Sequence, residues 1–200
     1  MKQEDIRRRD RIEPPAGKLG VLIVGMGGAV ATTLMAGVEA VRRGLAQPVG
    51  SLTQLGTIRL GKRTERRSPK IKDFVPLASL EDIVFGGWDI YEADALEAAR
   101  FARVLTPEHL DPIAPFLSGL KPMRAVFDRR FVKNLDGTYV KPGKDLRAHV
   151  DALKEDITGF CATNGCTRAV LIWCGSTEVF SRPEDIHASP EAFARAVEAG

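Results

Sequence analysis

An apolar run that passes directly into a cluster of glycines constrains the fold of this chain more than any other feature. Residues 19–24 read Leu-Gly-Val-Leu-Ile-Val, a short β-branched run typical of a parallel strand covered on both faces. Gly25, Gly27 and Gly28 follow. Apolar residues then recur at helical spacing, at Val30, Leu34, Val38 and Val41. Gly44 stands where this helix should end, so the pattern predicts a strand, a glycine turn and a helix in immediate succession.

The rest of the chain continues this alternation of strands and helices. We expect strands at 82–87, 125–128 and 169–173, the last of them buried, and helices at 92–105, 106–119, 146–160 and from Ser189 onwards. Asp136-Gly137 predicts a hairpin turn over 135–138, and residues 49–72 predict a long surface loop or ribbon. Such alternation favours an α/β fold with a Rossmann-like, doubly wound, mainly parallel sheet.

Composition and charge exclude several classes of protein. Of the 200 residues, 44% are hydrophobic and 28% charged, as in soluble globular domains, and a net charge of +3 is too small to indicate a nucleic-acid binder. The apolar runs are shorter than the roughly 20 residues of a membrane span. Residues 1–18 predict a flexible arm without the apolar stretch of a secretory signal, so we expect a cytoplasmic protein. The cysteines and histidines show no zinc-site spacing, and no metal is expected.

The glycine-rich turn has the chemistry of a dinucleotide site. Gly25 permits a tight turn, Gly27 lets a diphosphate approach the backbone, and unpaired amides at the start of the helix attract anions. The candidate contacts are Gly25, Met26, Gly27, Gly28, Ala29 and Val30. Thr32 and Thr33 are expected to add hydroxyl groups. The third glycine of the usual fingerprint is replaced by Val30, and no acid follows at the usual spacing of about 20 residues. A glycine turn that merely joins a strand to a helix is the alternative.

Three stretches together resemble the myo-inositol-1-phosphate synthase family. They are the glycine loop at 25–33 in its bacterial form, Gly-Gly-Trp-Asp-Ile at 86–90, and Leu-Ile-Trp-Cys-Gly-Ser-Thr-Glu at 171–178. The resemblance implies NAD as the cofactor. It makes Asp89 the acid that the usual spacing lacks, with a helix cap as the alternative role for this residue. It also implies cofactor contacts at Asp128 and in the turn formed by Cys174, Gly175, Ser176 and Thr177.

The resemblance further implies a reaction. Family members convert glucose 6-phosphate to inositol 1-phosphate, for inositol and phospholipid biosynthesis, by NAD-dependent oxidation, enolisation, ring closure and reduction. Their lysines for enolate and phosphate stabilisation lie in a later domain that matches no segment of this chain, so we name no catalytic residue. We expect residues 19–200 to form an NAD-binding domain with an incomplete sheet and without the catalytic domain, and this chain alone to be inactive. Homo-oligomers, typically tetramers, are usual in the family.

Two other functions remain open, namely an NAD-dependent sugar-phosphate dehydrogenase and a truncated, non-catalytic NAD-binding module. The role of the basic stretch is also open. It contains Arg59, Lys62, Arg63, Arg66, Arg67, Lys70 and Lys72. Because this stretch has no aromatic residue for base stacking, we favour a solvated loop, for which a subunit contact is one role, over contacts with phosphates.

Overall fold

Four parallel strands form the sheet of this protein. The computed structural model describes residues 16–143, 145–175 and 178–199. In those residues the strand order is β3-β2-β1-β4. The strands are β1 (Lys18–Val24), β2 (Ile83–Asp89), β3 (Met123–Arg124) and β4 (Cys166–Trp173). The chain builds outward from β1 to β3 and then crosses back to place β4 on the other side of β1. This reversal confirms the doubly wound α/β class, in which ligands bind at the carboxyl ends of the strands beside the reversal.

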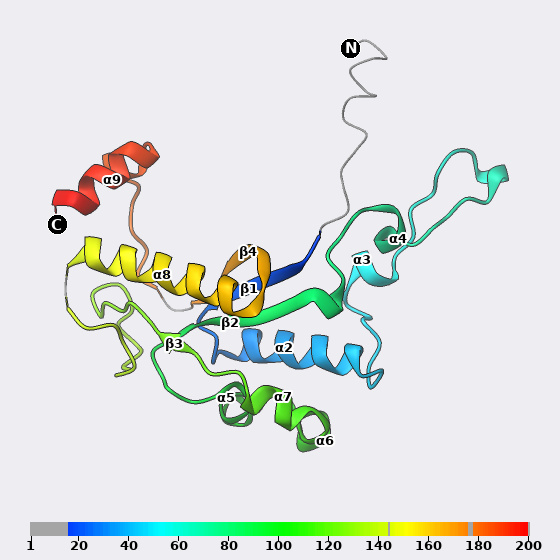
Figure 1. Ribbon diagram of the computed structural model, residues 1–200, viewed down its shortest axis with the longest axis horizontal. Coiled ribbons are helices and arrows are strands. Elements are labelled where there is room, and N and C mark those ends of the chain that lie inside the picture. The colour runs from blue at the N-terminus through cyan, green and yellow to red at the C-terminus, as the bar shows by residue number, and fades with distance from the viewer. Residues whose placement is uncertain (1–15, 144, 176–177, 200) are drawn as a thin grey trace, which may run out of the picture.

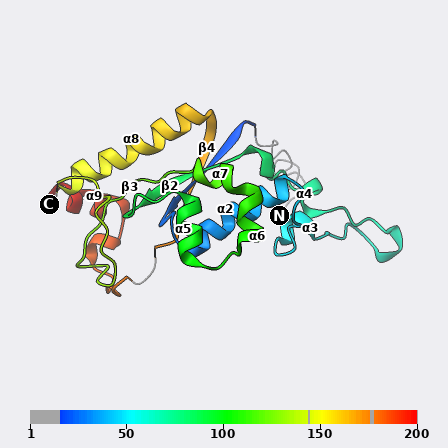
Figure 2. The same cartoon turned by 90° about the horizontal axis from the view of Figure 1, so that it is seen from below.

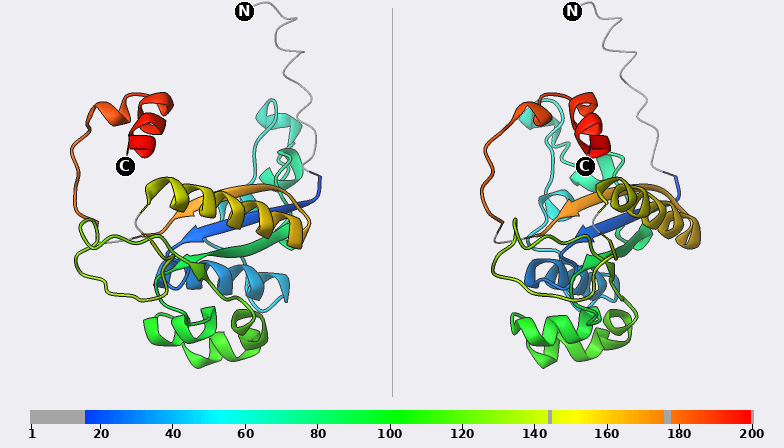
Figure 3. Two further views of the ribbon diagram at one scale, coloured as in Figure 1. Left: turned by 60° about the vertical axis from the view of Figure 1, so that its left-hand side comes forward. Right: turned by 90° about the vertical axis from the view of Figure 1, so that its left-hand side faces the viewer.

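Helices cover both faces of the sheet, as Figures 1 and 3 show. One face carries α8 (Leu146–Asn164), and α9 (Pro190–Ala199) lies near its start, where Arg147 and Glu198 form an ion pair of 3.4 Å. The opposite face carries α2 (Ala29–Arg42), α5 (Ala95–Ala102), α6 (Pro107–Leu110) and α7 (Ala114–Ser118), which Figure 2 shows side by side. None of the helices in the described ranges is long and apolar enough to cross a membrane.

The first strand forms the centre of the core, as its sequence predicts. Val21 and Ile23 pack into the apolar cluster beneath α2 and α5, whereas Leu22 packs into the cluster beneath α8. Leu22 and Ile23 are completely buried. Burying side chains of this size contributes about 1.5–3 kcal/mol each. β1 is therefore anchored on both faces, and the loop that leaves it starts from a rigid position.

The helix after the glycines forms as expected, but its buried side differs from the apolar residues that mark it in the sequence. Val30 is 71% exposed and Leu34 is 40% exposed. The buried apolar residues are instead Ala31, Met35 and Ala36, and Thr32 and Glu39 are buried on the same helix. Two alanines on this side let α2 approach the sheet closely, so small side chains decide which face is buried. The spacing predicts the helix correctly, and its orientation depends on packing.

The strand β4 is longer and more exposed than the buried strand expected at 169–173. It begins at Cys166 and pairs only with β1 among the described residues. Leu171 is 54% exposed and Trp173 is 64% exposed. The prediction of burial was wrong because β4 lies at the edge of the described sheet. An apolar run alone does not distinguish an edge strand from a central one.

The prediction was also wrong for the strand at 125–128 and the hairpin at 135–138. The strand β3 ends at Arg124, and Ala125 forms only an isolated parallel bridge with Val140. Gly137 does not have the positive φ of a tight hairpin turn. A Cβ on Gly137 would instead overlap the carbonyl oxygen of Ile90. This glycine is required by close contact between two backbones, not by turn geometry.

The remaining helices confirm most of the sequence reading. Asp94 caps α5 by accepting hydrogen bonds from the N–H groups of Leu96 and Glu97. The expected helix at 106–119 is divided into α6, the short turn η3 (Asp111–Ile113) and α7. Gly165 ends α8 in a left-handed conformation, with a φ of 67°. Local capping chemistry thus places the helix ends well.

Residues 49–72 form a long excursion between α2 and β2. It contains α3 (Leu52–Leu55), a two-stranded ribbon, the short turn η1 (Arg63–Glu65) and α4 (Ile71–Phe74), and η2 (Leu80–Asp82) precedes β2. The ribbon is held by backbone hydrogen bonds from Ile58 to Pro69 (3.0 Å) and from Leu60 to Arg67 (2.9 Å). Figure 1 shows it extending away from the sheet. We call residues 57–72 the basic ribbon; its form confirms the sequence expectation.

Candidate cofactor site

The glycine loop lies at the carboxyl end of β1 and is held there by β2. The N–H groups of Gly25 and Met26 both donate to the carbonyl oxygen of Trp88, at 2.9 and 3.1 Å. The N–H of Gly28 donates to the carbonyl oxygen of Gly25 at 3.0 Å, which closes a tight turn. Gly25 has a φ of +81°, in the left-handed region that favours glycine. The chain therefore leaves β1, turns once, and enters α2 directly.

Two of the loop glycines face neighbouring strands. A Cβ on Gly25 would lie 3.0 Å from the carbonyl oxygen of Cys174, just after β4. A Cβ on Gly27 would lie 3.1 Å from Oδ2 of Asp89, at the end of β2. The loop is thus enclosed between the carboxyl ends of β2 and β4. A side chain at either glycine would have to displace these neighbours.

The start of α2 has the properties of an anion site. Gly28 is the N-cap residue, in an extended conformation, and it has no side-chain cap. The N–H groups of the first turn, at Ala29, Val30 and Ala31, have no partner within the helix. Gly28, Ala29 and Val30 are exposed. Amides of this kind, together with the helix dipole, stabilise a nearby negative charge by about 0.3–1 kcal/mol.

Met26 and Thr32 are less available than the sequence suggests. The Met26 side chain is in the core at 1% exposure, and its N–H already donates to Trp88. Thr32 is also 1% exposed, and its hydroxyl donates to the carbonyl oxygen of Gly28 at 3.0 Å. The expectation of a ligand contact from the Thr32 hydroxyl is therefore wrong, because this hydroxyl is turned into its own helix.

Asp89 is the acid nearest the loop. Its Oδ2 accepts a hydrogen bond from the N–H of Gly27 at 2.7 Å, and its Oδ1 accepts one from the N–H of Tyr91 at 3.1 Å. It is 8% exposed. The cap of α5 is Asp94, so the alternative role of Asp89 as a helix cap is wrong. Asp89 ends the strand beside β1, and the excursion at 49–72 explains why it comes so late in the sequence.

Asp128 occupies a different part of the strand ends. It lies in the loop after β3 and pairs with Arg130, with Oδ2 at 2.6 Å from a guanidinium nitrogen. Hydrogen bonds from this guanidinium hold the pKa of Asp128 below its usual value. The hydrogen bonds and the ion pair that the described residues give the Asp128 carboxylate are with Arg130, and none is with the glycine loop.

A largely apolar hollow of about 880 Å³ adjoins Asp128; we call it the strand-end hollow. Its walls come from the ends of β1 and β4, the loop after β3 and residues 178–181. Its apolar lining includes Val24, Ile90, Phe127, Leu135, Trp173 and Val179. Gly175 also lines it, while Cys174 donates its N–H to the carbonyl oxygen of Val24 at 2.9 Å. Ser176 and Thr177 lie outside the described residues.

The structure thus divides the expected contacts into two adjacent groups. Gly25 to Val30 meet Asp89 at the start of α2, and Asp128 and Gly175 line the strand-end hollow. Sequence reasoning missed Ile90 and Trp173 in this hollow. A usable signal exists for both, because each stands at the carboxyl end of a predicted parallel strand, where ligands bind. Among the described residues no group of three or more His, Cys, Asp or Glu is arranged to hold a metal ion.

Comparisons with known proteins agree on one family. The family model described as myo-inositol-1-phosphate synthase matches residues 19–200. Inositol-3-phosphate synthase 1 of Bacteroides thetaiotaomicron is 46% identical over 189 residues, which cover 94% of this chain and 43% of that protein. Isozyme 1 of inositol-3-phosphate synthase from Arabidopsis thaliana is 33% identical over 82% of this chain and 35% of its own length. The chain thus spans less than half the length of these relatives.

A solved structure shares the fold. The crystal structure of inositol-3-phosphate synthase from Caenorhabditis elegans matches with a TM-score of 0.83 at 24% sequence identity. The match covers 93% of this chain and 40% of that one. At this identity the likeness shows the fold alone, that is, the arrangement of strands and helices.

Proposed function

This chain belongs to the myo-inositol-1-phosphate synthase family, and we propose that it binds NAD at the glycine loop for a synthase of that family. The main observation in support is that the carboxyl ends of β1, β2 and β4 lie together at the glycine loop. Gly27 contacts Asp89 after β2, Gly25 abuts Cys174 after β4, and the unpaired amides of α2 face outward beside both. This combination fits a dinucleotide, which needs an anion site and an acid for hydroxyl groups.

Each group has a distinct task in this proposal. The first-turn amides of α2 bind the diphosphate, and Gly27 keeps the backbone accessible to it. Asp89 retains acceptor capacity beyond its two backbone hydrogen bonds, because a carboxylate offers about four lone-pair sites. It therefore accepts from the ribose hydroxyls while holding the loop. Gly175 follows β4, beyond the reversal of strand order, on the side we propose for the nicotinamide, and Asp128 lines the same strand-end hollow from the loop after β3.

NAD, when bound, supplies the hydride acceptor and donor of the proposed reaction. The residues of this chain hold and orient it and exclude water from its apolar end. Trp173, Ile90 and Val24 provide apolar walls in the strand-end hollow. Tight binding is essential, because release of the reduced cofactor would leave the oxidised intermediate without a route to product.

The synthase reaction itself is a proposal for the whole protein. We propose that glucose 6-phosphate is converted to inositol 1-phosphate, in an oligomeric and cytoplasmic enzyme. The support is membership of the family described as myo-inositol-1-phosphate synthase, together with relatives named inositol-3-phosphate synthase. Since the chain spans less than half of those relatives, we assign no catalytic residue to it. Inositol phosphate formation by the 200 residues alone is expected to be absent.

The cofactor proposal is tested by measuring NAD binding calorimetrically with two valine variants. Gly27→Val places a side chain against Asp89 and should abolish measurable binding. Gly37→Val is the matched control, because Gly37 lies in the helix that follows the loop and a Cβ on it meets nothing within 4 Å. Gly37→Val should bind NAD within about twofold of the parent. Equal binding by the parent and Gly27→Val would reject the site.

A further inference from the structure

A second hollow lies at the opposite end of α2, well away from the glycine loop. It has a volume of about 510 Å³. We call it the α2-end hollow. It is lined by the last turn of α2 and residues 44–48, by α3 and α4, and by the turn η2. α2 has 14 residues, so the two sites are separated by about 20 Å along the helix.

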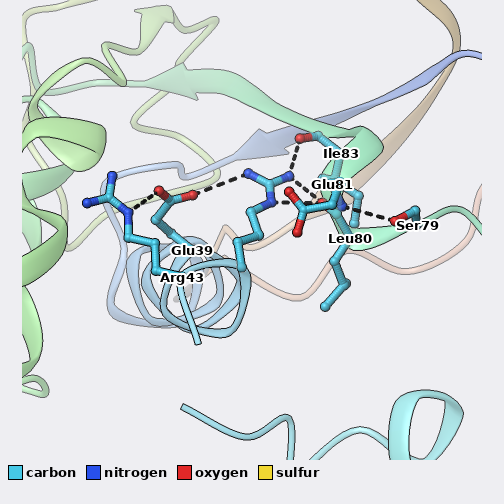
Figure 4. Close-up of polar contacts among 7 residues, drawn as sticks. Glu39, Arg43, Ser79, Leu80, Glu81 and Ile83 are labelled. Carbon is cyan, nitrogen blue, oxygen red and sulfur yellow. Dashed lines mark hydrogen bonds and ion pairs between the residues drawn. The ribbon is translucent and has the colours of Figure 1, made fainter. Parts of the chain in front are cut away.

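One wall of the α2-end hollow is fixed by a network of charges, shown in Figure 4. Glu39 is 8% exposed and accepts from Arg43 at 2.7 Å and from Arg42 at 3.5 Å. Arg42 also donates to the carbonyl oxygens of Leu80 and Ile83. The guanidinium group of Arg42 is therefore already hydrogen-bonded within the protein and forms part of the wall of the hollow. It fastens η2 to α2 and keeps the hollow open.

The other cations that line the hollow are not occupied in this way. Lys70 and Lys72 are exposed, and no ion pair in residues 16–143, 145–175 or 178–199 involves either of them. They belong to the basic ribbon, which has seven cations and the single acid Glu65, a net charge of +6 against +3 for the whole chain. Of these seven cations, only Lys70 and Lys72 line the hollow, and the others continue along the ribbon away from it. The two lysines attract anions to this side of the hollow.

The carbonyl oxygens of Glu39, Ala40 and Val41, at the end of α2, are hydrogen-bonded within the chain. They accept hydrogen bonds from the N–H groups of the residues that follow: Arg43 to Glu39, Gly44 to Val41, and Leu45 and Ala46 to Ala40. The negative end of the helix is therefore capped by its own chain. The charged side chains that line the hollow are Arg42, Lys70 and Lys72, together with the carboxylates of Asp73 and Glu81.

The remaining lining is suited to hydroxyl groups. Asp73 and Glu81 supply carboxylates, and Gln47 and Gln54 supply amides. Carboxylates and amides accept hydrogen bonds from hydroxyls, whereas an ammonium group suits a phosphate. We propose that the α2-end hollow binds a small phosphate ester that carries hydroxyl groups, with Lys70 and Lys72 at its phosphate. This site is separate from the NAD site and does not depend on it.

Ribose 5-phosphate is a suitable probe, with inorganic phosphate and ribose as its separate halves. Titration calorimetry on the 200-residue chain should show binding of ribose 5-phosphate, weaker binding of phosphate, and weakest binding of ribose. The double variant Lys70→Gln/Lys72→Gln should raise the Kd for ribose 5-phosphate at least about tenfold. The control Lys121→Gln/Lys154→Gln removes two exposed lysines elsewhere and should change this Kd by less than about twofold.

Two further variants locate the ligand. Asp73→Asn/Glu81→Gln should weaken the binding of ribose 5-phosphate and leave the binding of inorganic phosphate unchanged. Gly27→Val should not affect either, which separates this site from the glycine loop. Loss of binding in Gly27→Val but not in Lys70→Gln/Lys72→Gln would overturn the proposal, as would the absence of any binding by the parent. Loss of binding in Arg63→Gln/Arg67→Gln alone would also overturn the proposal, because it would show that the phosphate binds at the tip of the basic ribbon. Melting temperatures of all variants check that the fold is retained.

Discussion

The N–H of Gly27 donates a 2.7 Å hydrogen bond to the carboxylate of Asp89, a residue 62 positions later in the chain. The contact forms because β1 and β2 are adjacent and parallel, so their carboxyl ends reach the same edge of the sheet. It ties the loop that would bind a diphosphate to the acid that would bind a ribose. The two halves of the proposed dinucleotide site are thus held in one geometry by this hydrogen bond.

Replacing Asp89 should weaken NAD binding in a graded way. Asp89→Asn keeps an oxygen that can accept from Gly27 but loses the charge and one acceptor for hydroxyl groups. We expect its Kd for NAD to rise about tenfold. Asp89→Ala also removes the tie to the loop, and its Kd should rise about 10- to 100-fold, with a lower melting temperature. Calorimetry and thermal unfolding measure both effects. An alanine variant with the parent's Kd would show that Asp89 does not contact the cofactor.

Glu39 should be important for stability. Its carboxylate, nearly buried, compensates the Arg42 guanidinium, whose side chain is only 12% exposed. Glu39→Gln leaves that charge without its partner, and we expect the free energy of unfolding to fall by about 1–3 kcal/mol. Urea unfolding followed by circular dichroism measures this. The control is Asp151→Asn, which breaks an ion pair with Arg147 between side chains that are about half exposed. If both variants lost equal stability, burial of Glu39 would not be the cause.

The parts of the fold that were predictable depend on short-range chemistry. The strand at 19–24, the glycine turn and the end of α2 near Gly44 follow from apolar periodicity and glycine chemistry. The start of α8 was also predicted, but the helix continues to Asn164, past the expected end at 160. Burial was less predictable, because it depends on which strand becomes an edge. The apolar run at 169–173 has the composition of a central strand, yet β4 has a single neighbour in the described sheet.

The candidate site shows the same division. The glycine loop was identifiable from residues 25–30 alone. Asp89 was identifiable only by resemblance to a family, because the excursion between α2 and β2 breaks the usual spacing of the acid. The strand-end hollow as a whole was not predictable, although Ile90 and Trp173 stand at strand ends where ligands bind. Its walls come from several segments that are distant in sequence, so its existence depends on tertiary structure.

Gly137 provides a test of backbone contact. The N–H of Tyr139 donates to the carbonyl oxygen of Ile90 at 2.9 Å, and a Cβ on Gly137 would overlap that same oxygen. Gly137→Ala should therefore destabilise the protein by about 1–3 kcal/mol. Gly37→Ala, on the open side of α2, should have the opposite sign and stabilise by about 0.5–1 kcal/mol. Denaturant unfolding of the two variants gives both values. A neutral result for Gly137→Ala would mean that the loop yields to the added methyl group.

Asp128 allows a prediction about pH. Hydrogen bonds from Arg130 lower the pKa of Asp128 in the folded protein. Folding therefore favours the charged form of Asp128. The pair contributes fully to stability above the pKa of the unfolded chain, about 3.9. This contribution is lost as the pH falls through the lower pKa of the folded protein. Carboxyl NMR titration should show this pKa rising toward its ordinary value in Arg130→Gln. Arg129→Gln is the control, since Arg129 pairs with Asp136 instead, at 3.4 Å. If Arg130→Gln left the pKa of Asp128 unchanged, the ion pair would not be formed in solution. A ligand in the strand-end hollow could then contact the Asp128 carboxylate without first displacing Arg130.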